Sequence, residues 1–233
     1  MSIHNQEMWN KLSHDKWTII YRSKVSDKAI YNHEHADLLH FMIEYDDIQI
    51  LIDSGRSSYK FSDVHFDAFK SQYHNSVTID KLSYQPEYSK YFPNDYYQSN
   101  FDVAVKQDNE ILKIIFNGTG FNRIDRMIQF TREVILTNKY LLITDISMSP
   151  YTHIIDNYFH ISKDFFYDLD NDILTSNVNN LTIRYSGKCK FLSQDNKLTN
   201  GSEKYGEIYK KSVLHSTEKI DSNRKIINKF EIM

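Results

Sequence analysis

The sequence predicts an all-β protein, an antiparallel multi-stranded β-sandwich with a short N-terminal leader. Many short segments are rich in β-branched and aromatic residues and end at clusters of Asp, Asn, Gly and Pro. Several neighbouring segments are separated by only two to four turn-forming residues, which is the spacing of β-hairpins. Short strands joined by tight polar turns form antiparallel sheets, and two such sheets commonly pack face to face.

The expected elements follow one another without a long break. The expected strands span residues 17–25, 38–45, 48–53, 75–80, 101–107, 111–118, 127–136, 140–148, 157–162, 173–178, 181–187, 189–194, 211–219 and 225–233. Tight turns are expected at 46–47, 107–110, 137–139 and 179–180. The only helix that the sequence suggests runs from about Asn5 to Leu12. We therefore expect residues 1–16 to be a leader or the remnant of a preceding segment, and residues 17–233 to form one sandwich domain.

The composition suits a folded domain of this kind. The chain has 233 residues, a length at which all-β sandwiches are often one unit. Apolar residues make up 40% and aromatic residues 14%, which is enough for a substantial core. With only six glycines and three prolines, the sequence is not typical of a loop-dominated or low-complexity protein.

Charge, cysteine content and hydropathy exclude several classes of function. A net charge of -3 without any run of Lys and Arg gives no reason to expect nucleic acid as a partner, although a local basic patch could still bind a polyanion. Cys189 is the only cysteine, so neither an intrachain disulfide nor a cysteine metal cluster can form. There is no secretory signal and no run of about 18 apolar residues, so we expect no membrane span and, for the sequence as written, a cytoplasmic location.

The first candidate site lies in the segment YNHEHAD, residues 31–37. Successive side chains of a strand alternate between its faces, so His33, His35 and Asp37 would share one face. Two imidazoles beside a carboxylate form a ligand set that zinc accepts. The alternative is that both histidines are solvated surface residues at a strand edge.

Asp53 and His74 are the next candidates. Asp53 ends an apolar strand, where a carboxylate needs a partner; it could bind a metal or accept backbone N–H bonds from the following turn. If Asp46 and Asp47 form a two-residue hairpin loop, Asp53 falls opposite His40, on the face away from His35, so a joint site requires a bend or bulge near residues 36–37. His74 begins another strand and could reach the same sheet end, or could serve as a hydrogen-bonded structural residue.

Other chemistry finds little support in the sequence. There is no G-x-S-x-G motif, no glycine loop suited to phosphate and no cysteine with a plausible base. The segment 84–100 is a polar loop with several Tyr and Phe residues and two prolines. Its aromatic rings could stack on sugars, or could simply pack the loop.

The order of three motifs resembles the C-terminal β-sandwich domain of the heparinase II/III-like polysaccharide lyases. The motifs are H-x-H-A-D at 33–37, D-x-G-x-x-x-Y at 53–59 and H-N-S-V-T-I-D at 74–80. The segments RMIQFTREVIL, YLLITDIS and NYFHIS are similar to the continuation of that domain, so the resemblance covers roughly residues 20–165.

The resemblance implies a metal site and a chemistry. By motif position, His35, Asp53 and His74 would hold zinc, and His33 would face the substrate cleft in a catalytic role. Histidine ligands favour zinc over calcium. Members of the family cleave acidic polysaccharides that contain uronic acids by β-elimination, in which a base removes the proton next to the carboxylate. The same positions imply that Arg56, Lys70 and Asn75 contact the substrate.

The sequence also departs from the family pattern. The usual Arg before the H-N motif is Lys70, and the common D-P-G-T reads Asp53-Ser54-Gly55-Arg56. Full-length members carry a helical toroid that supplies the tyrosine base, so we expect catalysis to need a separate helical domain or subunit. A non-catalytic carbohydrate-binding or assembly module is the alternative. A metal hydrolase that uses the same ligands to activate water is a third reading.

Overall fold

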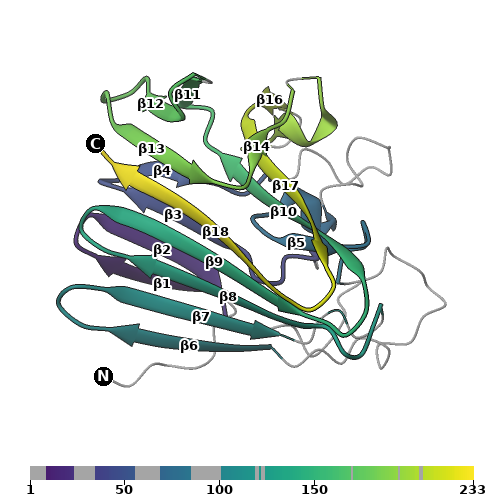
Figure 1. Ribbon diagram of the computed structural model, residues 1–233. Helices are drawn as coiled ribbons and strands as arrows, with labels where there is room; N and C mark the ends of the chain where they lie inside the picture. The colour runs from purple at the N-terminus through teal and green to yellow at the C-terminus, as the bar shows by residue number, and fades with distance from the viewer. Residues whose placement is uncertain are drawn as a thin grey trace.

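A computed structural model describes residues 9–23, 35–55, 69–84, 101–118, 121, 124–168, 170–193, 195–204 and 207–233. Two antiparallel sheets of eight strands each face one another (Figure 1). The all-β sandwich predicted from the sequence is therefore confirmed.

The first sheet, sheet A, carries the candidate site. Its main path runs through β1 (Trp9–His14), β2 (Trp17–Arg22), β3 (Phe41–Tyr45), β4 (Ile48–Leu51), β10 (His153–Ile161), β17 (Ser212–Ile220) and β14 (Lys190–Phe191), and β5 (Val77–Ile79) pairs with β10. Both β4 and β5 pair with β10, at opposite ends of that strand. The strand pairing along β10 is therefore interrupted between the last residue of β4 and the first residue of β5, where Ile52 and Asn75 bond to His160 instead.

The second sheet, sheet B, closes the other side of the core. Its strands run in the order β11 (Phe165–Asp168), β12 (Ile173–Ser176), β13 (Thr182–Gly187), β18 (Asn223–Ile232), β9 (Tyr140–Met148), β8 (Gln129–Leu136), β7 (Leu112–Gly118) and β6 (Phe101–Gln107). The remaining elements are the two-stranded pair β15 (Asn200–Gly201) and β16 (Tyr209–Lys210) and the 3-10 turns η2 (Ser71–Tyr73) and η4 (Lys197–Thr199).

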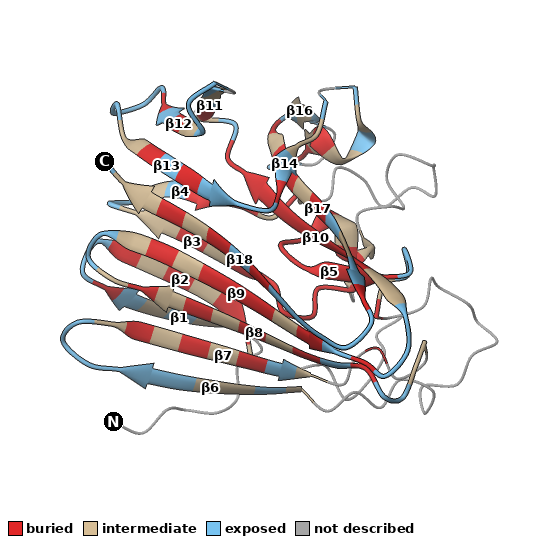
Figure 2. Cartoon of the chain, viewed as in Figure 1, coloured by how far each residue is buried: buried red, intermediate tan, exposed pale blue. Residues whose placement is uncertain are grey.

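The core follows from the period-two pattern of the strands. Along β8 every second residue is buried, and Figure 2 shows this alternation on β7 and β8 of sheet B. Large side chains from both sheets fill the space between them, among them Trp17, Phe41, Phe116, Phe159 and Phe230. Full burial of such a side chain contributes about 1.5–3 kcal/mol, so this interior dominates the stability of the fold.

Most expected strands occur within a few residues of their predicted bounds. Strands β6 and β9 match the prediction, whereas β10 begins four residues earlier, at His153 instead of residue 157. The expected helix is wrong where the structure describes it, because Trp9–Leu12 belong to β1, which pairs with β2 along its whole length. Residues 5–8 lie outside the described residues, and the domain boundary at residue 17 stays a prediction. Among the described residues, no helix is long and apolar enough to cross a membrane.

The hairpin from β3 to β4 has the expected loop but not an ideal ladder. Tyr45 pairs with Ile48 across the Asp46–Asp47 turn, and the register then shifts between Ile43 and Glu44. Before β3 the chain turns sharply, because the His40 amide donates to the Asp37 carbonyl and Leu39 has a φ of 68°. This bend places His40, the residue before β3, close to Asp53 beyond the end of β4.

Candidate metal centre

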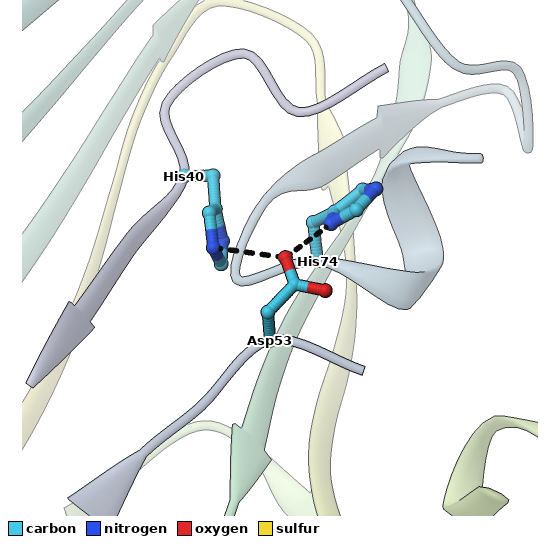
Figure 3. Close-up of side chains that lie close together, drawn as sticks. All are labelled: His40, Asp53 and His74. Atoms are coloured by element: carbon cyan, nitrogen blue, oxygen red, sulfur yellow. Dashed lines mark hydrogen bonds and ion pairs between the residues drawn. The ribbon is translucent and has the colours of Figure 1, made fainter. Parts of the chain in front are cut away.

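His40, Asp53 and His74 form a compact cluster beside the interruption of strand pairing between β4 and β5. One ligand atom from each residue lies within 4.8 Å of the other two. In Figure 3 both imidazoles point at one oxygen of Asp53. Asp53 Oδ2 is 2.8 Å from His74 Nδ1 and 3.0 Å from His40 Nε2. The His74 contact is an aligned hydrogen bond, whereas the His40 contact is close without that alignment.

The electrostatics of the cluster favour an ionised Asp53. Both histidines are almost fully buried, whereas 29% of the Asp53 side chain is exposed. Burial opposes ionisation of Asp53, but the two imidazoles outweigh it and hold the pKa of the carboxyl well below its usual range. Burial likewise opposes protonation of His74, but the Asp53 carboxylate raises its pKa above the usual value. The cluster therefore presents a carboxylate at neutral pH.

Asn75 ties the strands around the cluster together. Its side-chain amide donates to the carbonyls of Phe41 (2.7 Å) and Ile52 (3.1 Å), and its oxygen accepts from the His160 amide (2.7 Å). Its backbone N–H donates to His40 Nδ1 at 3.0 Å. Asn75 thus links the start of β3, the end of β4 and β10, and it also fixes the ring of His40.

A fully buried arginine from sheet B supports the cluster from inside the core. Arg132 forms two hydrogen bonds with the Asp145 carboxylate, Nε to Oδ1 at 2.6 Å and one Nη to Oδ2 at 2.8 Å. Its other Nη donates to the carbonyls of Asn75 (2.7 Å) and Leu39 (3.2 Å). Leu39 precedes His40 and Asn75 follows His74, so one guanidinium holds the backbone beside both histidines.

A buried lysine secures the turn that follows Asp53. Lys211 is only 2% exposed, and its ammonium donates to Ser54 Oγ (2.9 Å) and to the carbonyls of Asn200 (2.6 Å) and Leu198 (3.3 Å). Burial lowers the pKa of Lys211 to about 7. The Gly55 amide donates to Asp53 Oδ1 at 2.8 Å. Both carboxylate oxygens of Asp53 are therefore oriented, one by the turn and the other by the histidines.

The predicted site residues fall into three groups. Asp53 and His74 lie together, and the His35 ring lies beside His74 with 5.1 Å between the ring centroids. Lys70 immediately precedes η2, whereas the Asn75 side chain is buried and bonded to backbone groups. His33, Arg56 and residues 85–100 of the predicted aromatic loop lie outside the described residues. The ligand role of His35 and the substrate contacts of Lys70 and Asn75 stay predictions.

The donors at this site fit a metal ion. His74 Nδ1 is bonded to Asp53, but its Nε2 is buried and has no hydrogen-bond partner in the described part of the chain. Metal-bound histidines commonly donate their second nitrogen to a carboxylate, which is how His74 is arranged. Imidazole nitrogens and a carboxylate oxygen suit zinc. His74 could hold it through Nε2 together with the neighbouring His35, and for Asp53 to bind the same ion, as the motifs predict, His74 would present Nδ1 to the metal instead.

A second group of one histidine and two carboxylates lies where β10 begins. Its histidine has no ring nitrogen without a partner. His153 Nδ1 is 2.7 Å from Asp80 Oδ2 and its Nε2 is 3.0 Å from Asp125 Oδ2. Burial opposes protonation of His153, but these two carboxylates outweigh it and raise the pKa of the imidazole. Because both ring nitrogens of His153 are hydrogen-bonded to carboxylates, this group has no ring nitrogen available for a metal.

Sequence reasoning missed the residues that support the site. The predicted hairpin placed Asp53 opposite His40, and this was the signal that could have identified His40 as a contact of Asp53. Arg132 alternates with more exposed positions in the same way as the buried residues Phe130, Val134 and Leu136 of β8, so its side chain faces the core. Lys211 follows the short strand β16, and nothing in its local sequence distinguishes it from a surface lysine.

Fold and site together define the class of this protein, an all-β sandwich domain with a histidine–carboxylate centre. A family model described as heparinase II/III-like, C-terminal, matches residues 7–221. The chain belongs to this family, which confirms the resemblance seen in the sequence. Among curated proteins, no sequence matches the chain.

Solved structures of larger lyases share the fold. A heparan sulfate lyase, HepC from Pedobacter heparinus, matches with a TM-score of 0.69 and 10% identity over 97% of this chain and 36% of its own. A structure titled heparinase III matches with a TM-score of 0.67 and 15% identity over 93% of this chain and 33% of its own. These identities show the fold alone, and the chain spans about a third of the length of these lyases.

Proposed function

We propose that this chain is the β-sandwich part of a polysaccharide lyase that cleaves uronic-acid-containing acidic polysaccharides by β-elimination. The observation that carries the proposal is the family match over residues 7–221 together with Asp53 and His74, two residues of its ordered motifs, in contact at one site. The lyases that share the fold include one named for heparan sulfate, which is a polymer of the proposed class.

The proposed reaction assigns separate tasks to this chain and to a helical partner. In β-elimination a base removes the proton next to the uronate carboxylate, the glycosidic bond breaks, and the leaving oxygen takes up a proton. His33 would face the substrate and assist proton transfer, while Lys70 and Arg56 would attract the acidic polymer. Family resemblance assigns the base and the groups that neutralise the uronate carboxylate to the helical toroid. The sandwich would therefore be inactive until such a domain completes the cleft.

The metal would have an organising role in this scheme. His35, Asp53 and His74 would hold a zinc ion, which supplies a fixed positive centre at the rim of the cleft when bound. Asp53 is suited to this role because its two oxygens are already oriented by the Gly55 amide and by imidazoles. The buried Arg132 and Lys211 keep the backbone of the site in place without taking part in the chemistry.

The test is eliminative cleavage of glycosaminoglycans and alginate, followed by the ultraviolet absorbance of the unsaturated uronate product. We expect product when the chain is combined with the helical domain of a related lyase, and about 10²–10⁴-fold less with His33→Ala, the range for loss of a proton-transfer group. Zinc content should be unchanged in that variant. Affinity for a glycan without any product would favour the binding-module alternative. Inactivity both alone and in combination, across all these polymers, would contradict the proposal.

A further inference from the structure

We propose that His40 is a positioning residue for Asp53 and is not a ligand of the metal, although it lies in the same cluster. The inference deepens the proposed metal site and rests on it. Distance alone would make His40, Asp53 and His74 the three ligands. The hydrogen bonds of the two imidazoles lead to a different assignment.

The tautomer of His40 is set by a backbone amide. The Asn75 N–H points at His40 Nδ1 with a separation of 3.0 Å. A backbone N–H can only donate, so Nδ1 must present its lone pair, and the neutral ring then carries its hydrogen on Nε2. Nε2 is the nitrogen that faces Asp53 Oδ2 at 3.0 Å. In this tautomer Nε2 carries the hydrogen, close to the carboxylate but without the alignment of a hydrogen bond, and it has no lone pair for a metal.

The backbone that imposes this tautomer is rigidly held. The Asn75 carbonyl accepts from Arg132, and the Asn75 side chain bonds to three backbone groups around it. The His40 ring is fully buried and packs edge-on against Trp9, with 5.7 Å between the ring centroids. Moving the hydrogen to Nδ1 would set two donors against each other in a buried place, where the lost hydrogen bond cannot be replaced by water.

His74 has the opposite arrangement. Its Nδ1 donates to Asp53, so the lone pair of the neutral ring lies on Nε2. Nε2 of His40 and Nε2 of His74 are both buried without an aligned hydrogen-bond partner among the described residues, but only that of His74 carries a lone pair. His35 lies on this side, with its ring centroid 5.1 Å from that of His74. Nε2 of His74 is therefore the nitrogen that can bind a metal, and the neighbouring His35 would supply the second imidazole. His40 instead contacts the carboxylate of Asp53, which orients the His74 ring through Nδ1.

The variants His40→Gln and His40→Leu separate a positioning role from ligation. Glutamine can accept from the Asn75 amide and donate to Asp53, but a neutral amide is a poor zinc ligand. We expect His40→Gln to retain zinc affinity near that of the wild type, and His40→Leu to lose about 10–100-fold, the effect typical of residues that orient a ligand. His74→Ala should abolish stoichiometric binding. If His40→Gln lost zinc as completely as His74→Ala, His40 would be a ligand and the inference would be wrong.

A spectroscopic measurement tests the inference even if the variants fold poorly or no metal binds. Long-range ¹H–¹⁵N correlation spectra of wild-type protein report which nitrogen of each histidine carries hydrogen. We expect His40 to show hydrogen on Nε2 in both metal-free and zinc-loaded protein. Hydrogen on Nδ1 in either state would overturn the inference. Failure of wild-type protein to bind zinc would instead contradict the proposed metal site and would leave the tautomer result to stand alone.

Discussion

Arg132→Leu should lower the free energy of unfolding by about 3–5 kcal/mol, the cost of breaking a buried ion pair by removing one partner. The substitution leaves the Asp145 carboxylate in the core without its cation, and Asp145 is only 1% exposed. It also deprives the carbonyls of Leu39 and Asn75 of a shared donor. Urea unfolding, followed by tryptophan fluorescence, measures the change.

An ion pair on the outer face of the same sheet provides the control. Lys113 on β7 and Glu133 on β8 are 2.8 Å apart, and each side chain is about a quarter exposed. Such pairs contribute about 0–1 kcal/mol, so Lys113→Met should have little effect. The double variant Arg132→Leu/Asp145→Leu should recover part of the loss, because no unpaired charge remains. An Arg132→Leu variant as stable as Lys113→Met would contradict the structural role described for the guanidinium.

Gly55→Ala should destabilise the chain by a similar amount and also weaken zinc binding. Gly55 has a φ of 67°, a conformation that costs an alanine about 1–2 kcal/mol. An added Cβ would also overlap the Ser202 carbonyl oxygen, and overpacking of this kind costs about 1–3 kcal/mol. Because the Gly55 amide donates to Asp53 Oδ1, any shift of this turn reorients the carboxylate. Thermal unfolding and zinc titration measure the two effects.

Asp47 offers a matched position for this comparison. It has a φ of 63°, but it is exposed in the turn between β3 and β4. Asp47→Gly removes a Cβ at this conformation and therefore reports, with opposite sign, the cost of the backbone conformation without the overlap, and zinc affinity should not change. If Gly55→Ala lost no more stability than Asp47→Gly gained and did not affect zinc, the close approach of Gly55 to Ser202 would have no part in shaping the site.

The strands were predictable because their side chains alternate with period two and their turns are polar. Strands β6 and β9 show this in their matching bounds. Strand β1 was missed because only two of its six residues, Trp9 and Leu12, are large and apolar, and it is a strand because it pairs with β2 at the sheet edge. Short pieces such as β15 and β16 depend on contacts with Lys211 and Ser54, which no local pattern reveals.

The site was only partly predictable, because several of its contacts join segments that are distant in the sequence. Asp53 and His74 could be named from ordered motifs, and the structure brings them into contact. The shift of register within the β3–β4 hairpin, which offsets the ideal pairing of His40 with Asp53 by one residue, cannot be read from spacing. Arg132 and Lys211 are charged residues on or beside strands, and local sequence does not determine whether such a residue is buried. Ser54 lies 157 residues before Lys211 in the chain, and the carbonyls that Arg132 binds belong to Leu39 and Asn75, beside the strands of the other sheet.

The central claim is that the motifs of this chain assemble a metal site, and the zinc content of tag-free purified protein tests it most directly. Wild-type protein should contain zinc at close to one ion per chain, as expected for a tetrahedral structural or organising site. His35→Ala and His74→Ala should lose it, whereas His40→Gln should keep it. Wild-type protein without zinc, even after it is supplied, or zinc that persists in both alanine variants, would contradict the account.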